Sequence, residues 1–293
     1  MQEIKVCPVC EGLQLKKYLS CKDYTVSHER FQLTKCETCN LIITNPRPDD
    51  SKLGKYYISE DYISHTSSAK SLIDRIYLIA RKFTLNKKLK LISRYNKPGK
   101  LLDYGCGTVE FINHCKSNGW VITGIEPSSV AREKATSLTL TKIKTSLQEL
   151  GEERFDVITL WHVLEHIPNF EETLKTISKQ LNDGGTLFIA VPNYQSLDAE
   201  IYKNIWAGYD VPRHLWHFAP STIKKLLSNN SLTLKEIVPM KLDSFYVSLL
   251  SEKYKRSKQS LPGMINAFVN GLRSNLKAKK TGNYSSLIYI IQK

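Results

Sequence analysis

A short run of residues, 100–111, most constrains how this chain folds. In this run, apolar residues lead into an acid and two glycines, Asp103, Gly105 and Gly107, and a helical pattern follows. It predicts a buried strand, a tight turn and a helix N-terminus, and a turn without Cβ atoms lets a ligand approach the backbone. Nucleotide-like cofactors bind at such a turn after the first strand of a parallel sheet. The alternative is a turn that only connects the strand to the helix.

From residue 100 onward, strand-like and helix-like segments alternate. This pattern predicts an α/β protein whose parallel sheet is covered on both faces. A turn at residues 183–185, Asp-Gly-Gly, precedes one of the strands. We expect strands at 100–104, 120–125, 139–143, 155–160, 186–191, 232–238 and 287–291, and helices at 109–118, 128–137 and 170–181.

Length and composition are those of a globular protein in aqueous solution. The 293 residues are enough for one medium domain and a smaller module. We find neither a signal peptide nor an apolar run as long as a membrane span, so we expect a cytoplasmic protein.

The net charge of +14 is unevenly distributed along the chain. Residues 70–100 contain ten Lys and Arg against one acid, and residues 241–293 contain ten against two acids. Basic segments of this kind attract RNA, anionic lipid headgroups or phosphorylated substrates. The alternative is that they are solvated, lysine-rich helix faces.

Four of the seven cysteines form two C-x-x-C pairs, which predict a metal site in a reducing compartment. Cys7 and Cys10 are separated from Cys36 and Cys39 by a segment that suits a small β-ribbon, and Cys21 lies outside the pairs. Four thiolates fill the tetrahedral coordination of zinc and leave no open position. We therefore expect a structural zinc ion, with an iron site of the rubredoxin type as the alternative.

We divide the chain into three regions. Residues 1–48 form a zinc-ribbon module, residues 49–98 an aromatic linker with basic amphipathic helices, and residues 99–293 the main domain. The main domain includes a lid at 193–222 and a helical insertion at 243–280.

The linker and the insertion both have an unusual composition. Tyr56, Tyr57, Tyr62 and His65 lie within ten residues of the linker, which either packs against the main domain or crosses the mouth of the active site. The insertion contains an apolar stretch, 264–272, that is followed by several basic residues. A basic amphipathic helix there fits contact with a membrane surface, packing over the substrate pocket, or a dimer contact.

An acid at the tip of the second strand fits the glycine turn. Glu126 follows Gly105 by 21 residues, and its carboxylate can accept hydrogen bonds from both hydroxyls of a cofactor ribose. NAD and an adenosyl cofactor both suit this acid, but the dinucleotide pattern has a third glycine where this chain has Glu110. The alternative is a surface carboxylate after a strand.

The residues after the strand at 155–160 extend the pattern. Residues 161–168 read WHVLEHIP. Together with the glycine turn, Glu126 and the Asp-Gly-Gly turn, they resemble the class I S-adenosylmethionine-dependent methyltransferases over residues 99–192. The resemblance implies a Rossmann-like sheet of seven strands in the order 3-2-1-4-5-7-6, with the last strand antiparallel. It also implies S-adenosylmethionine as the cofactor.

The resemblance also implies which residues surround the cofactor. The family usually has glycine where this chain has Val109, a difference within the turn at which the cofactor is expected. Asp103, Gly105, Cys106 and Gly107 would border the methionine part, Glu126 and Pro127 the ribose, Leu147 and Gln148 the adenine, and Trp161 and His162 the side next to the substrate.

Two groups of histidines are candidates for proton transfer, because the pKa of histidine lies near neutrality. His162 and His166 are four residues apart and would share a helix face, with Glu165 orienting one of them. In the lid, Arg213 could grip a carboxylate or phosphate, and His214 could be the base. The alternatives are a structural role for His166 and a packed lid without chemistry.

Residues 206–218 also resemble, more loosely, zinc-ribbon-bearing bacterial methyltransferases, some of which act on sugars. We interpret the chain as a methyltransferase for a small-molecule acceptor: a sugar, a nucleotide-linked sugar or a lipid-linked precursor. One alternative is an RNA methyltransferase that holds nucleic acid with its zinc ribbon and basic helices. Another is a scaffold protein that kept the fold without turnover. Neither the acceptor atom (O, N or C) nor the oligomeric state follows from these motifs.

Overall fold

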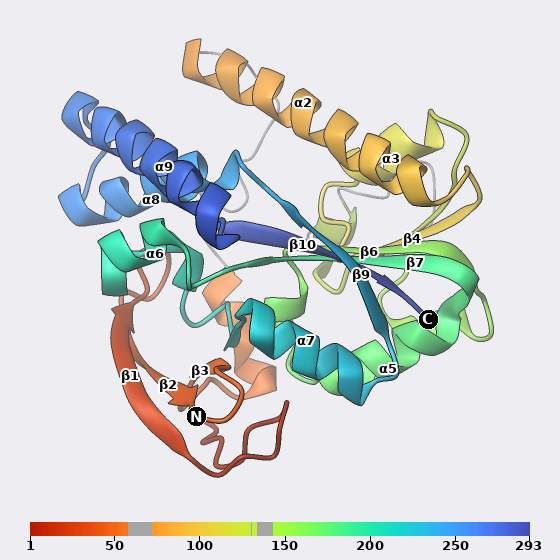
Figure 1. Cartoon of the computed structure of the whole chain (residues 1–293), viewed down its shortest axis with the longest axis horizontal. Coiled ribbons are helices and arrows are strands. Elements are labelled where there is room, and N and C mark those ends of the chain that lie inside the picture. Colours follow the sequence, from red (N-terminus) through yellow and green to blue (C-terminus); the bar gives the residue numbers. More distant parts are fainter. Residues whose placement is uncertain (58–71, 130, 134–142) are drawn as a thin grey trace.

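The computed structural model describes residues 1–57, 72–129, 131–133 and 143–293. A central sheet lies between two layers of helices (Figure 1), as predicted for an α/β protein. Its six described strands are β4 (Lys100–Tyr104), β5 (Val121–Ile125), β6 (Phe155–Trp161), β7 (Leu181–Pro192), β9 (Thr233–Pro239) and β10 (Ser286–Gln292).

The strands are ordered β5-β4-β6-β7-β10-β9. β4, β5, β6 and β7 are parallel, whereas β10 runs antiparallel to both β7 and β9. The order implied by the family and its antiparallel last strand are therefore confirmed for these six strands. Most of the expected strand at 139–143 lies outside the described residues, but Lys144 forms a parallel bridge with Ile125 at the outer edge of β5. That edge is where the family order puts the seventh strand.

Helices cover both faces of the sheet (Figure 1). Side chains of β7 alternate between two cores, with Leu187 and Ile189 on one face and Phe188 on the other, as expected for a strand buried on both sides. α2 (Leu72–Tyr95) and α3 (Glu110–Lys116) lie over one face, and α5 (Phe170–Gln180) and α7 (Pro220–Asn229) over the other.

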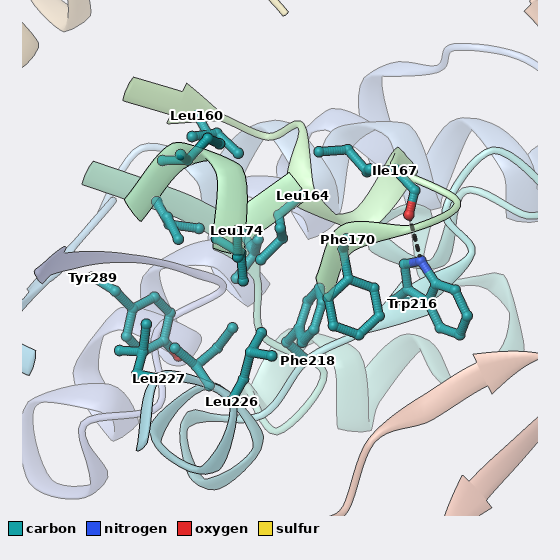
Figure 2. Packing of buried hydrophobic residues seen from close by; sticks show 14 of the residues in the cluster. Leu160, Leu164, Ile167, Phe170, Leu174, Trp216, Phe218, Leu226, Leu227 and Tyr289 are labelled. Carbon is teal, nitrogen blue, oxygen red and sulfur yellow. Dashed lines mark hydrogen bonds between the residues drawn. The ribbon is translucent and has the colours of Figure 1, made fainter. Parts of the chain in front are cut away.

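The core beneath α5 and α7 continues into the N-terminal region. Leu174 of α5, Leu226 of α7 and Tyr289 of β10 belong to it (Figure 2), and so does Ile43 near the N-terminus. In the same core, the indole N–H of Trp216 donates a hydrogen bond of 2.8 Å to the carbonyl of Ile167 (Figure 2). The N-terminal region is therefore packed as part of one unit with the main domain.

The N-terminal module is a smaller sheet to which the main domain contributes a strand. β1 (Leu15–Lys22), β2 (Arg30–Cys36) and β3 (Ile42–Thr44) are antiparallel neighbours, and β8 (Trp216–His217) pairs with β3. Two residues of the expected lid thus complete the sheet of the expected module. The division into 1–48, 49–98 and 99–293 stays a proposal. In the structure, β8 belongs in sequence to the third region but pairs with the sheet of the first.

The remaining helices lie near the carboxyl ends of the parallel strands (Figure 1). Within the described ranges, no helix is both long and apolar enough to cross a membrane. These helices are α6 (Leu197–Tyr202), α8 (Asp243–Arg256) and α9 (Leu261–Thr281), and the last two occupy the expected insertion. The chain also forms short 3-10 helices: η1 (Asp50–Tyr57), η2 (Leu147–Leu150), η3 (Leu164–His166), η4 (Lys203–Ile205) and η5 (Ala207–Tyr209).

Some local expectations differ from the structure. The Asp-Gly-Gly segment, 183–185, is not a turn before a strand, because β7 already begins at Leu181 and its pairing with β6 jumps from there to Thr186. The intervening residues bulge outward, and the Asp156 carboxylate accepts a hydrogen bond of 2.8 Å from the Asn182 side chain. The expected helix at 128–137 lies partly outside the described residues. Tyr62 and His65 of the aromatic linker lie wholly outside them.

Candidate functional site at the carboxyl ends of the strands

The glycine turn between β4 and α3 is formed by two residues in the left-handed region, Gly105 at φ +74° and Gly107 at φ +50°. A Cβ on Gly105 would lie 2.5 Å from a methyl carbon of Val163, so only glycine fits there. Apart from Gly107 and its two chain neighbours, no atom of the described residues lies within 4 Å of the place where a Cβ of Gly107 would be. The backbone of Gly107 is therefore open to a ligand.

Val109 adopts the conformation for which the family uses glycine. Its φ is +60°, which is unfavourable for a β-branched residue, at a cost of about 1–2 kcal/mol. Its side chain is fully buried in the core beneath α2 and α3. The side chain is thus directed away from the open face of the turn, and the backbone path is kept.

Glu126 connects the glycine turn to the end of β5. Its carboxylate accepts hydrogen bonds from the N–H groups of Gly107, at 2.9 Å, and Ser128, at 3.0 Å. Each oxygen uses one lone pair for this contact and keeps another for a ligand hydroxyl. This geometry suits the expected contact with a ribose.

Asp103 lies beneath the turn and is almost fully buried. The Thr159 hydroxyl donates a hydrogen bond of 2.5 Å to its carboxylate. Burial raises the pKa of Asp103 to about 7, although the Thr159 hydroxyl and the charge of Lys88 oppose this rise. The ammonium of Lys88, from α2, lies 4.5 Å from the centre of the Trp161 ring. The indole N–H of Trp161 is buried and has no hydrogen-bond partner in the described part of the chain.

The other residues expected at the cofactor lie in varied surroundings. Cys106 and Leu147 are buried, and each belongs to a hydrophobic core. Pro127 and Gln148 are exposed. Cys106 therefore offers a ligand mainly its backbone, and its expected role and those of the other three stay predictions.

His162 directly follows β6 and has a left-handed backbone, with φ +57°. Such a conformation in a residue other than glycine is frequent at functional sites. Its Nε2 lies 3.1 Å from the carboxylate of Asp243, the first residue of α8, and its Nδ1 lies 3.4 Å from that of Glu165. Burial alone would lower the pKa of His162, but the two carboxylates raise it to about 9.

The arrangement of His162 and His166 differs from the expected one. They do not share a helix face, because His162 lies in a left-handed turn and His166 ends the short helix η3. His166 instead meets His214 of the lid, with their ring centres 4.6 Å apart. Burial and the neighbouring charge of His214 lower the pKa of His166 to about 4, so its ring is neutral.

Backbone carbonyls orient both of these rings. Nδ1 of His166 donates to the carbonyl of Arg213 at 3.1 Å and also lies 3.0 Å from the Tyr57 hydroxyl. Nδ1 of His214 donates to the carbonyl of Gly208 at 2.9 Å. Because a carbonyl only accepts, Nδ1 carries a proton in each ring, and the neutral ring of His166 has its lone pair on Nε2.

Glu165 completes this cluster and is only 1% exposed. Within the described residues, neither of its carboxylate oxygens has a hydrogen-bond partner, and the contact with His162 is long for a hydrogen bond. Burial favours the neutral acid, but the neighbouring His162 ring lowers the pKa of Glu165 and keeps it ionised. One ligand atom from each of Glu165, His166 and His214 lies within 4.8 Å of the others.

Arg213 joins the lid to the N-terminal regions and is buried. Its guanidinium donates two hydrogen bonds to Asp210, at 2.6 and 2.9 Å, one to Asp23 of the module at 3.1 Å, and one to the carbonyl of Tyr56 at 2.9 Å. Burial would lower the pKa of Arg213, but its two carboxylate partners raise it. These contacts favour a structural tie over the expected grip on a substrate.

The four paired cysteines converge in the N-terminal module. The sulfur atoms of Cys7 and Cys39 are 3.5 Å apart, as are those of Cys10 and Cys36, and all four lie within 4.8 Å of one another. Sulfur atoms that bind one zinc ion at 2.3 Å are separated by about 3.8 Å. Cys21 lies elsewhere, buried in a separate core.

Several residues of the site have no clear signal in the sequence. Asp243 and Lys88 are single charged residues on helices, and Asp23 and Asp210 carry no motif. Tyr57 was noted only for the aromatic density around it. A weak signal for Asp243 was available, since acids are frequent in the first turn of a helix, but nothing in the sequence connects it to His162.

Comparisons with known proteins agree with this geometry. A family model described as a methyltransferase domain matches residues 77–237, more than half of the chain. A ubiquinone biosynthesis O-methyltransferase of Pelagibacter ubique is 26% identical over 209 residues, which cover 67% of this chain and 85% of that protein. A protein of the same name from Vibrio atlanticus is 32% identical over 103 residues, 32% of this chain and 44% of its own length.

Solved structures show the same fold at low sequence identity. The cyclopropane synthase MmaA2 of Mycobacterium tuberculosis has a TM-score of 0.53 and 14% identity, with 81% of this chain and 95% of that one covered. The magnesium protoporphyrin IX methyltransferase of Synechocystis PCC 6803 with bound SAH has a TM-score of 0.52 and 14% identity, with 84% and 100% covered.

The contacts of Arg213 predict a large effect on stability. Arg213→Met should lower the free energy of unfolding by about 3–5 kcal/mol, because it leaves the buried Asp23 and the half-buried Asp210 without the guanidinium that pairs with them. Urea unfolding followed by tryptophan fluorescence measures this change. As a control, Lys16→Met removes an exposed pair with Glu37 and should cost at most about 1 kcal/mol. Equal stability of the two variants would contradict the structural role of Arg213.

Proposed function

We propose that this chain, which belongs to the methyltransferase domain family, methylates an oxygen atom of a lipid-linked small molecule at a membrane surface. That it is an S-adenosylmethionine-dependent methyltransferase for a small-molecule acceptor is shown by the family match and the named relatives. The proposal adds the class of acceptor, the place where it is met and the residues that act. The observation that carries it is an outward-facing apolar surface on α9, a helix packed against α8, whose first residue contacts His162.

The described residues fit S-adenosylmethionine, which supplies a methyl group on a positively charged sulfonium when bound. The open backbone at Gly107 leaves space for it. The indole N–H of Trp161, which has no partner among the described residues, is a free donor. The buried carboxylate of Asp103 supplies a negative charge. We assign Asp103, Gly105, Cys106 and Gly107 to its methionine part, Glu126 and Pro127 to its ribose, Leu147 and Gln148 to its adenine, and Trp161 and His162 to the side facing the acceptor.

Asp103 should make cofactor affinity depend on pH. Its carboxylate, with a pKa of about 7, attracts the positive charges of the cofactor only when it is ionised. The affinity should therefore rise with pH below this value, by up to about tenfold per unit, and level off above it. Calorimetric titration with S-adenosylmethionine at several pH values measures this dependence. Asp103→Asn should bind more weakly and without this rise, and a flat wild-type profile would contradict the assignment.

We assign proton removal from the acceptor to His162. It is partly exposed at the end of β6, and Asp243 and Glu165 orient its ring. Its pKa of about 9 keeps most His162 rings protonated at neutral pH, so the base is the smaller fraction with a free imidazole, and that imidazole is a stronger proton acceptor because of the raised pKa. We assign Arg213 and His214 as positioning residues for this site, because both lie in the buried part of the lid that packs against η3.

The surface that supports a lipid acceptor is the outer side of α9. Small residues of this helix, including Ala267 and Gly271, face α8, and a Cβ on Gly271 would lie 2.7 Å from the ring of Phe245. The large apolar residues face outward instead, the reverse of an ordinary amphipathic helix packed on a core. This face, the α9 apolar face, consists of Leu261, Met264, Ile265, Phe268, Val269, Leu272 and Leu276.

Charge favours an anionic lipid surface as the partner of this face. α9 contains Arg273, Lys277, Lys279 and Lys280 and no acidic residue. A second copy of the chain would bring like charges together, whereas anionic headgroups would neutralise them. The neighbouring helix α8 begins at Asp243, which contacts His162. A lipid-linked acceptor would thus enter beside the proposed base.

Vesicle binding tests the membrane contact. The full-length protein should float with phosphatidylcholine vesicles that contain phosphatidylglycerol, and much less with phosphatidylcholine alone. Replacing Ile265 and Phe268, which are 56% and 62% exposed, by serine should weaken this binding by about tenfold to a hundredfold. The matched control replaces two exposed apolar residues of the module, Leu13 and Tyr18, by serine and should bind normally. A wild-type dimer that dissociates in the Ile265/Phe268 variant would point to a second copy instead.

Methyl transfer tests the acceptor class directly. The protein is incubated with S-adenosylmethionine labelled in its methyl group and with a bacterial membrane extract, and His162→Gln serves as the inactive control. We expect label in the lipid-soluble fraction. Label confined to water-soluble products, sugars and nucleotide-linked sugars included, would contradict a lipid-linked acceptor.

We also propose that Cys7, Cys10, Cys36 and Cys39 bind one structural zinc ion. Because β8 belongs both to the module sheet and to the main domain, zinc removal should destabilise the whole chain. A chelator should lower the temperature of the single unfolding transition and weaken S-adenosylmethionine binding. Cys21→Ser is the matched control and should keep one zinc per chain by elemental analysis. A chelated protein with unchanged melting temperature and cofactor affinity would contradict this role.

A further inference from the structure

The cluster of Glu165, His166 and His214 brings together metal-ligand side chains from two distant parts of the chain. η3 provides the first two and the lid provides the third. One ligand atom from each lies within 4.8 Å of the others. We propose that these three residues bind a divalent transition-metal ion, at a site separate from the four cysteines.

Both histidines are held as metal ligands usually are. The Nδ1–H of His166 donates to the carbonyl of Arg213, and that of His214 donates to the carbonyl of Gly208. Such hydrogen bonds fix the tautomer and the orientation of a ligating imidazole and leave Nε2 free for the metal. The tautomers needed for binding are therefore already set by the backbone.

The carboxylate of Glu165 is the second, independent observation. It is 1% exposed; within the described residues its Oε1 makes a long ion-pair contact of 3.4 Å with Nδ1 of His162, and neither oxygen accepts a hydrogen bond. A buried charge without hydrogen bonds is strongly unfavourable unless an ion compensates it. A cation between Glu165 and the two imidazoles would supply the missing partner.

The surrounding charges also favour a cation. Carboxylates face this region from several elements: Glu165 from η3, Asp210 from the lid, Asp23 from the module and Asp243 from α8. The described cations among them are the guanidinium of Arg213, the ring of His162 and the ammonium of Lys88, which acts on Asp243. The negative charges thus outnumber the positive ones.

The ligand set indicates the class of metal. Two imidazoles and one carboxylate suit Mn²⁺, Fe²⁺, Co²⁺ or Zn²⁺ rather than Ca²⁺ or Mg²⁺, which prefer oxygen ligands. Three protein ligands leave coordination positions open, as in catalytic rather than structural sites. If the proposed function holds, these open positions would take an oxygen of the acceptor.

The probe for this site is MnCl2, added to the full-length protein with zinc already bound at the cysteines. Mn²⁺ is detected by electron paramagnetic resonance and prefers nitrogen and oxygen ligands to thiolates. We expect one Mn²⁺ bound per chain, with spin-echo modulation from directly bound imidazole nitrogen. Glu165→Gln and His214→Gln should each weaken binding by at least about tenfold. His114→Gln, a histidine of α3 outside the cluster, should bind Mn²⁺ normally.

Two results would overturn the inference: no Mn²⁺ bound by the wild-type protein at millimolar MnCl2, or bound Mn²⁺ without nitrogen modulation. Undiminished binding by both folded cluster variants would overturn it as well. The nitrogen signal is read on the wild-type protein, so it decides the question even where a variant fails to fold. S-adenosylmethionine binding is measured on the same samples. Cofactor binding without Mn²⁺ binding would remove this inference alone, whereas Mn²⁺ binding without methyl transfer to lipids would remove the proposed function alone.

Discussion

A single buried residue, Leu215, makes the backbone contacts on which the functional end of the molecule depends. Its N–H donates a hydrogen bond of 2.9 Å to the carbonyl of Glu165, and its own carbonyl accepts one of 3.0 Å from the N–H of Thr44. Because buried backbone groups need partners, this residue ties the segment after β6 to the sheet of the module. Trp216 and His217 continue the connection as β8. The N-terminal module is therefore packed against the site and is not an appendage.

The same connection explains the charges of the site. It places Arg213 between Asp210 and Asp23, and His214 beside His166. His162 lies on the other side of Glu165 and reaches Asp243 of the helical insertion. Segments far apart in the chain thus share one buried electrostatic network. Through these contacts the module is connected to the proposed base without providing a catalytic group itself.

Two residues hold unfavourable backbone conformations next to the cofactor region. Val109 and His162 both have positive φ, where glycine would be unstrained. Burial of the Val109 side chain offsets the strain at the glycine turn. At His162, the contacts with Asp243 and Glu165 hold the ring in place. The first residue preserves the turn of the family with a different side chain, and the second aims an imidazole toward the expected acceptor.

The sequence alone determined the α/β class, the glycine turn and the paired cysteines, because each depends on local periodicity or on short, fixed spacings. The strand order followed from the resemblance to the methyltransferase family. Glu126 and Asp103 could be found in this way, since both lie at strand ends. Only the tertiary structure decided the partners of Arg213, the meeting of His166 with His214, and the link from His162 to Asp243. Those contacts join residues up to about 190 positions apart, as in Arg213 and Asp23. No local pattern specifies such pairs, because they depend on how the lid, the module and the insertion pack against one sheet edge.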